Sequence, residues 1–294
     1  MNHKFKINFI VFSQFPNYID YIGGSVVSHT IANQLASLGE NVYLYANSTP
    51  FKNVNLINWG QEVSYDPRNT VVILTAGNGE HTFEKDVPDF IKKCPNIIRH
   101  LVNQQVAEYP DSNKIYSLGP YFRELTTQKL SGYLPILNVD YDIFKNQNLN
   151  RSGRCFLIKG DEYIKNQPIH HNAYDFNIDN YWSYTGDRMK YLADVFNKHE
   201  IFFTYNQQTF ISVLAALCGC VSVIIPHPDY GKEKVMKFPQ NKFGIAYGFD
   251  DIQHSKDTMH LVEPHIKSIQ QEHINQTKQF MTDCYNWLET KYNI

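Results

Sequence analysis

The sequence lacks the patterns that mark several classes of protein. Its five cysteines form no CxxC pair, so neither a disulfide framework nor a structural zinc site is indicated. Its 27 Lys and Arg residues are matched by 29 Asp and Glu residues, and the resulting formal charge of -2 gives no broad positive field. We therefore expect no nucleic acid partner.

Long hydrophobic runs are also missing. No stretch reaches the roughly 18 continuous apolar residues that a membrane span requires. The apolar run from Ile7 to Phe12 alternates like a strand, and no small-residue cleavage site follows it, so we interpret it as a core strand and not as a signal peptide. We expect a soluble, cytoplasmic protein that contacts a membrane at most peripherally.

The glycine motifs of two common nucleotide sites are absent as well. The sequence holds no GxGxxG, which disfavours a nicotinamide or flavin dinucleotide, and no GxxxxGK[ST], which disfavours an NTPase. We expect neither a resident cofactor nor a metal ion.

What is present is the composition and length of a globular protein with two domains. The chain has 294 residues, of which 43% are hydrophobic and 19% charged, so general disorder is excluded. A polar, Asn-rich stretch from Lys145 to Gly153 has too little apolar content for a core. It places the predicted boundary between domains 1–147 and 148–294.

Both predicted domains alternate strands and helices. In the first, a helix over 25–38 is capped by Ser25 and closed by Gly39, and a short helix near 86–93 follows; strands are expected at 7–12, 42–45, 71–75, 97–102 and 114–117. In the second, helices are expected at 187–198 and 207–218, with strands at 155–158, 201–204, 221–225 and 244–247. The tail 259–292 is helical in pattern. This alternation predicts α/β domains with doubly wound parallel sheets.

Glycines between the first strand and helix form one candidate site. Gly23 and Gly24 let an anion approach the backbone, and a helix N-terminus offers unpaired N–H groups and a positive dipole end. The spot suits a phosphate or a carboxylate. A plain tight turn is the alternative interpretation.

Basic side chains after two buried strands are further candidates. Lys159 follows the strand at 155–158, where the carboxyl end of a parallel sheet would direct it at a diphosphate. Arg99 and His100 follow Ile98 and could contact an acceptor or a leaving phosphate. A satisfied structural pair is the alternative for Arg99 and His100. The pair His170-His171 has no partner at metal-ligand spacing and is predicted to lie at the surface.

The segment 203–226 is the most informative. A strand ends in a polar turn, a helix of small apolar residues follows, Gly219 closes it and an apolar strand resumes. The turn offers donors for an anion, and its first residue could stack on a base or a sugar. The candidate donor-binding residues of this turn are Tyr205, Asn206, Gln208 and Thr209.

At these residues the sequence resembles a known family. LAALCGCVSVIIP at 214–226 is similar to the donor-site segment of GT-B glycosyltransferases, in particular the family 4-like group. YIGGSVVSHTIANQLASLGENVYLY at 21–45 resembles the glycine-rich first loop and helix of these enzymes, and LNVDYDIF at 137–144 resembles the turn that ends their first domain. The family's usual paired glutamates appear here as Asn206 and Leu214.

The resemblance implies a fold and an activity. The fold would be GT-B-like, with two Rossmann-like domains facing across a cleft. The activity would be that of a hexosyltransferase-like enzyme in polysaccharide biosynthesis, which moves a sugar from a nucleoside diphosphate donor to a glycan or lipid-linked acceptor, with no metal and with retention of configuration. The missing glutamates leave a catalytically silent sugar-nucleotide or glycan-binding protein as the alternative. A sugar-nucleotide epimerase has no motif in its favour.

Overall fold

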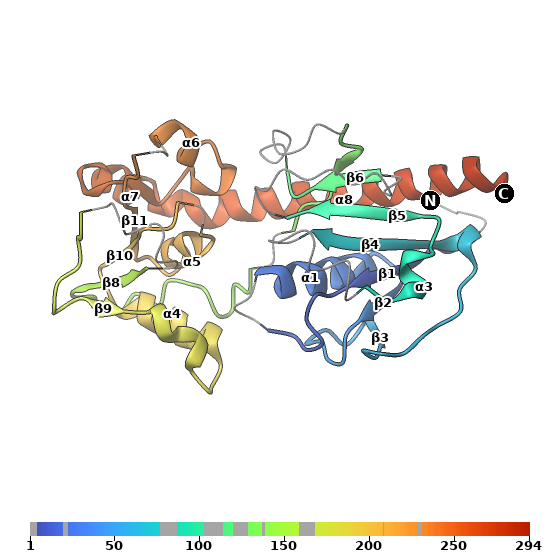
Figure 1. The fold of residues 1–294 in the computed structure, drawn as a ribbon. Coiled ribbons are helices and arrows are strands. Elements are labelled where there is room, and N and C mark those ends of the chain that lie inside the picture. The colour runs from blue at the N-terminus through green and yellow to red at the C-terminus, as the bar shows by residue number, and fades with distance from the viewer. Residues whose placement is uncertain are drawn as a thin grey trace. The chain divides into compact units, whose positions relative to one another are not determined.

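The computed structural model describes residues 5–19, 23–76, 87–102, 114–119, 129–136, 139–158, 168–207, 209–228 and 231–294. The chain divides into two compact units, each with its own parallel sheet (Figure 1). Unit 1 comprises Met1–Asn138 and Gln270–Ile294, and unit 2 comprises Val139–Ile269.

Unit 1 is built on a seven-stranded sheet of order β3-β2-β1-β4-β5-β6-β7, in which every pairing is parallel. The order reverses between β1 and β4, which is the topological switch point where open α/β sheets bind ligands. The strands are β1 (Asn8–Phe12), β2 (Asn41–Tyr45), β3 (Asn55–Ile57), β4 (Thr70–Ala76), β5 (Ile97–Leu101), β6 (Lys114–Ser117) and β7 (Gly132–Tyr133).

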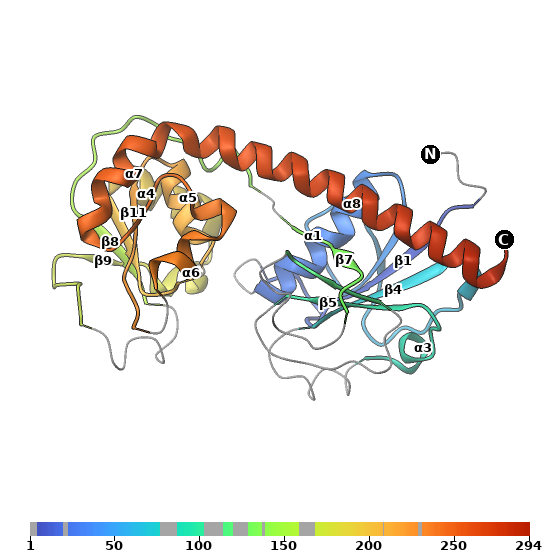
Figure 2. The same ribbon diagram turned by 90° about the horizontal axis from the view of Figure 1, so that it is seen from above.

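Helices cover both faces of this sheet. Seen from above, α1 (Gly23–Ser37) and the part of α8 (Val262–Tyr292) that belongs to unit 1 lie on one side, and α3 (Asp89–Lys92) lies on the other (Figure 2). Alternation along β1 explains this, because Phe9 and Val11 enter one hydrophobic cluster while Ile10 and Phe12 enter the other.

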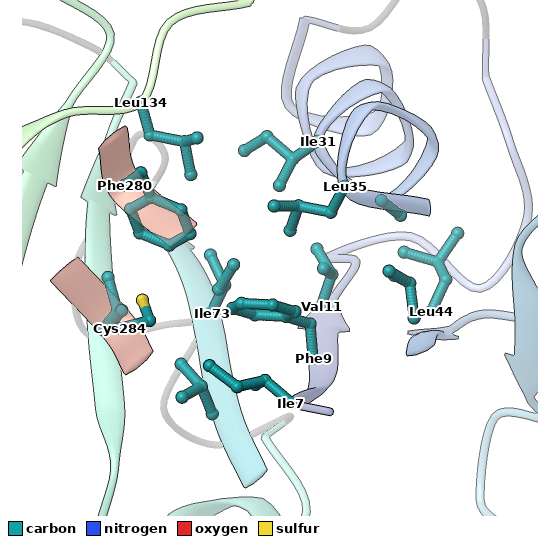
Figure 3. Close-up of a cluster of buried hydrophobic side chains, with 14 of the residues drawn as sticks. Ile7, Phe9, Val11, Ile31, Leu35, Leu44, Ile73, Leu134, Phe280 and Cys284 are labelled. Carbon is teal, nitrogen blue, oxygen red and sulfur yellow. The ribbon is translucent and has the colours of Figure 1, made fainter. Parts of the chain in front are cut away.

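The larger cluster joins the sheet to α1 and α8. Figure 3 shows side chains of both helices pointing at those of the strands. The central members are Phe9, Val11, Ile31, Leu35, Ile73, Phe280 and Cys284, all buried. Phe280 meets the ring of Tyr116 edge-on at 4.8 Å between centroids. The C-terminal helix therefore completes the core of the N-terminal sheet.

The start of α1 differs from the prediction. The helix begins at Gly23 and not at Ser25, so the two glycines are its first residues. The Ser25 hydroxyl does not cap the helix from outside but accepts the N–H of Ile19 at 2.9 Å, which ties the preceding loop to the first turn. At the other end, Gly39 has φ +96°, the left-handed conformation expected of a helix-closing glycine.

Unit 2 holds a five-stranded parallel sheet of order β12-β11-β10-β8-β9. Its strands are β8 (Arg154–Leu157), β9 (Phe176–Asn177), β10 (Ile201–Thr204), β11 (Val221–Ile224) and β12 (Ile245–Tyr247). Its helices are α4 (Arg188–Lys198), α5 (Ile211–Leu217), α6 (Lys232–Met236), α7 (Ile252–Thr258) and the first turns of α8. Short 3-10 turns lie in unit 2 at Asp179–Ser183, Pro239–Asn241, Phe249–Asp251 and Met259–Leu261, and in unit 1 at Pro67–Asn69.

The division of the chain differs from the predicted boundary at 147/148 in two respects. Residues 139–147 belong to unit 2, because Asn197 of α4 accepts the N–H of Gln147 at 2.8 Å and donates to the carbonyl of Lys145 at 3.1 Å. The polar stretch is thus fastened to a helix. The tail from Gln270 onward belongs to unit 1, because its apolar side chains are buried in the same hydrophobic cluster as those of α1 and the strands.

All five cysteines are free and buried. Among the helices of the described residues, none combines the length and hydrophobicity needed to cross a membrane.

Candidate functional site

In each unit, the candidate residues gather at the carboxyl end of the sheet. In unit 1, Thr75 of β4, His100 of β5 and Tyr116 of β6 are neighbours in the strand register. In-register residues of parallel strands point to the same face, which here is the face that α1 and α8 cover.

His100 lies inside this layer. The His100 side chain is 0% exposed, and its Nε2 lies 2.7 Å from the carbonyl oxygen of Leu134. Figure 3 labels Leu134 at the edge of this layer. A carbonyl oxygen only accepts, so Nε2 carries the hydrogen and Nδ1 is left as an acceptor. Burial lowers the pKa of His100 to about 4, so the ring is neutral at pH 7.

Arg99 and His100 do not act as one pair. They are adjacent on a strand, so their side chains leave the sheet on opposite faces. Arg99 is also buried, at 6% exposure. The structure therefore separates two residues that the sequence placed together in one cleft.

Gly23 and Gly24 open α1, which directs their backbone N–H groups out of the helix end. Further along α1 lies His29, which no motif in the sequence marks as a candidate. Its Nδ1 lies 3.1 Å from the hydroxyl of Thr49, and its ring packs against Tyr18 with 4.9 Å between centroids. Burial lowers the pKa of His29 to about 4, so this ring is also neutral.

In unit 2, the polar turn after β10 is only partly within the described residues. Lys159 and Gln208 lie outside them. The backbone N–H of Asn206 donates to the hydroxyl of Thr204 at 3.1 Å. The hydroxyl of Thr209 accepts the N–H of Ile211, the first residue of α5, at 3.3 Å, so the helix begins later than predicted.

Tyr205 differs from its expected role as a stacking surface, because its side chain is 1% exposed. Its hydroxyl accepts the backbone N–H of His170 at 2.7 Å and lies 3.1 Å from Nδ1 of His171. The His171 ring stacks on Phe156 at 4.5 Å. Tyr205 and the histidine pair thus form one packed cluster over the sheet, and His170-His171 is half-buried, not a free surface pair.

Gln207 and Asp179 fix the strand ends, and neither was found from the sequence. The Gln207 amide donates to the carbonyls of Tyr205 at 3.1 Å and Ile225 at 2.7 Å, which joins the ends of β10 and β11. A carboxylate oxygen of Asp179 accepts the N–H of Ile158 at 2.6 Å, directly after β8. Burial raises the pKa of Asp179.

The sequence also holds one D-x-D triplet, Asp140-Tyr141-Asp142, which was not among the predicted site residues. Asp140 accepts the backbone N–H groups of Asp142 at 2.9 Å and Ile143 at 3.3 Å, so its carboxylate stabilises a turn. Within the described ranges, no three His, Cys, Asp or Glu side chains gather as a metal ion would require.

Comparison with known proteins establishes the fold. No protein-family model matches the chain, and no curated protein sequence matches it. Solved structures match nearly its full length, among them two with TM-scores above 0.5. Sucrose-phosphate synthase from Thermosynechococcus elongatus has a TM-score of 0.55 and 9% identity, over 96% of this chain and 100% of that one. AviGT4, a glycosyltransferase involved in avilamycin A biosynthesis, has a TM-score of 0.53 and 12% identity, over 97% and 98%.

The chain thus has an α/β, GT-B-like fold with two Rossmann-like sheets, and the predicted fold class is confirmed. The cleft between the domains stays a prediction.

Proposed function

We propose that this protein is a glycosyltransferase that moves a sugar from a nucleoside diphosphate donor to a glycan or lipid-linked acceptor. The observation that carries the proposal is the match over 97% of the chain to AviGT4, a glycosyltransferase. The parallel strands of both sheets support it, because all carboxyl ends of a parallel sheet lie at one edge, and α/β folds bind ligands at that edge.

We assign the donor to the carboxyl edge of the sheet in unit 2. There Lys159 would neutralise the diphosphate, and Asn206, Gln208 and Thr209 would donate hydrogen bonds to the donor. Tyr205 is a positioning residue in this assignment, since its hydroxyl fixes the loop at His170. In unit 1, the N–H groups of Gly23 and Gly24 would bind an anionic group of a substrate.

In this proposal the negative charge that develops on the leaving diphosphate is stabilised by hydrogen-bond donors and Lys159, with no metal ion. Transfer retains the configuration of the sugar and takes place in the cytoplasm during polysaccharide synthesis. We also propose that the enzyme belongs to the hexosyltransferase class. On the acceptor side His100 acts as a neutral acceptor of a hydrogen bond, and Arg99, whose side chain leaves β5 on the opposite face, does not share its site.

One observation favours a second candidate, a catalytically silent sugar-nucleotide or glycan-binding protein. Leu214, which stands where the family has its second glutamate, is 8% exposed and packed within α5. It offers no carboxylate to a ribose. Under this alternative the protein binds a donor and releases no product.

The test is a binding measurement followed by a turnover measurement. Titration calorimetry with UDP-glucose, GDP-mannose and dTDP-glucose should give binding by one of them, and mass spectrometry should then detect released nucleoside diphosphate. Lys159→Ala should weaken donor binding, with Lys198→Ala, at the exposed end of α4, as the matched control. Binding without product across an acceptor panel would favour the silent alternative, and an unchanged donor Kd in Lys159→Ala would refute the role of Lys159.

A further inference from the structure

Four buried polar atoms in unit 1 have no hydrogen-bond partner among the described residues: Nε2 of His29, the hydroxyl oxygen of Thr75, Nδ1 of His100 and Nδ1 of His273. Of these four, only the atoms of Thr75 and His100 belong to neighbouring strands of the sheet. Thr75 is 4% exposed and His100 is 0% exposed. Buried polar groups without partners are rare in native proteins, so each such group calls for a physical explanation.

The two atoms belong to directly paired residues. Thr75 of β4 is the register partner of His100 of β5. Neighbouring strands lie about 4.8 Å apart and in-register side chains share a face. One oxygen atom at about 2.8 Å from each group spans up to about 5.6 Å. A single oxygen atom can therefore bridge the two groups.

The pair lies at the carboxyl end of its strands. Thr75 is followed by Ala76, the last residue of β4, and His100 by Leu101, the last residue of β5. This is the edge of an open α/β sheet at which ligands bind. The amino end of β4 differs, because there the carbonyl of Thr70 is bonded by the Asn96 amide at 2.8 Å.

The hydrogen positions define what the missing partner must be. Because Nε2 of His100 donates to Leu134, its Nδ1 requires a donor. The Thr75 hydroxyl has a hydrogen to donate. A hydroxyl group meets both needs, since it donates to His100 and accepts from Thr75. A carboxylate or phosphate oxygen has no hydrogen for Nδ1, and an ammonium group would bring an unpaired charge into a buried position.

We propose that Thr75 and His100 together bind one hydroxyl group, which is a sugar hydroxyl of the acceptor in the complex and a water molecule in the free protein. The hydroxyl site follows from the geometry of unit 1 alone. Its assignment to an acceptor rests on the proposed function. Thr75 is thereby a specificity residue, because an acceptor that lacks this hydroxyl would leave two buried groups unsatisfied.

The hydroxyl site can be tested by NMR on protein carrying ¹⁵N-labelled histidine, since the Nδ1 signal of a neutral ring reports whether that nitrogen accepts a hydrogen bond. His100→Gln, which keeps a side-chain N–H for Leu134, assigns the signal by its loss. We expect a hydrogen-bonded Nδ1 in the wild type and in Thr75→Ser, and an unbonded Nδ1 in Thr75→Val. Thr70→Val, on the same strand at its opposite end, is the matched control and should leave the signal unchanged.

Titration with methyl α-glucopyranoside, methyl α-galactopyranoside and methyl α-mannopyranoside separates the two sources of the hydroxyl. Movement of the Nδ1 signal by one glycoside in the wild type, and not in Thr75→Val, supports the acceptor assignment. A bonded signal that no glycoside moves would overturn that assignment and identify water as the sole occupant. An unbonded Nδ1 in the wild type, or one that Thr75→Val does not change, would overturn the hydroxyl site itself.

This experiment needs neither a donor nor turnover, so its failure differs from the failure of the proposed function. If transfer is observed, Thr75→Val should also raise the acceptor KM about three- to tenfold with the donor KM unchanged, the loss expected for one neutral hydrogen bond. Thr75→Ser should restore it. An unchanged acceptor KM in Thr75→Val would contradict the acceptor assignment.

Discussion

Acid should destabilise this protein in part through His100, and the contribution can be calculated. The ring is buried on β5 with a pKa of about 4, against an ordinary value of 6.5 in the unfolded chain. Between these values the unfolded state binds the proton and the folded state does not, so stability falls as the pH falls from above 6.5 towards 4. One such histidine lowers the free energy of unfolding by about 2 kcal/mol between pH 7 and pH 5.

The assay compares the wild type with His100→Gln, which keeps a side-chain donor for the Leu134 carbonyl and cannot titrate. Urea unfolding at pH 7 and pH 5 gives four free energies of unfolding. The wild type should lose about 2 kcal/mol more than the variant on acidification. Other titrating groups such as His29 and His273 are present in both proteins and cancel in this double difference. Equal losses in the two proteins, within about 0.5 kcal/mol, would refute the buried neutral ring.

Three further predictions concern packing and local geometry. Phe280→Ala should lower the free energy of unfolding by about 3–5 kcal/mol in urea denaturation, because a fully buried ring is deleted from the core of unit 1; a loss below about 1 kcal/mol would show that α8 does not complete that core. In the same assay, Gly244→Ala should lower the free energy of unfolding by at least about 1 kcal/mol more than Gly39→Ala does. Both glycines have positive φ, but an added Cβ overlaps Val262 only at Gly244; equal costs would contradict this. Tyr205→Phe should cost about 1–3 kcal/mol, since two hydrogen bonds to the histidine pair are lost, and an unchanged melting temperature would refute them.

Much of the fold was predictable from residue patterns. Strands such as 201–204 and 114–117 were predicted at the bounds that the structure has, because β-branched and aromatic residues bounded by polar turns identify buried parallel strands. Helix α4 ends at Lys198 as predicted and begins one residue later than predicted, because Asp187 is its N-cap and accepts the N–H of Lys190 at 3.1 Å. The order of strands and helices, together with the segment 214–226, was sufficient for the fold class.

Short elements and long-range contacts were not predictable in the same way. Strands β3, β7 and β9 have only two or three residues, too few for a periodic signal, and exist through pairing with a longer neighbour. The boundary was misplaced because a polar stretch was interpreted as a linker, whereas the side chain of Asn197 bonds it to α4. Both the short strands and the boundary between the units depend on tertiary contacts, which the local sequence pattern does not show.

The candidate site shows the same limit at the level of single residues. Tyr205, directly after β10, and His100 of β5 were both predicted to face an open cleft, but both side chains are buried. Gln207 gave no signal in the sequence, because its role depends on the carbonyl of Ile225, which pairing of β10 and β11 brings near. The role proposed for Thr75 could not be predicted from the sequence, because it depends on the pairing of Thr75 with His100 in the strand register.

The most direct test of the central claim is a thermal-shift titration of the full chain with nucleoside diphosphates and their sugar conjugates. A ligand that binds only the folded state stabilises it by RT ln(1 + [L]/Kd), about 2.7 kcal/mol at a concentration of 100 Kd, so a donor should raise Tm selectively for one base. Thr209→Val should reduce this rise and Thr70→Val should not. The absence of a rise with every nucleotide would contradict the assignment of unit 2 as a donor-binding domain.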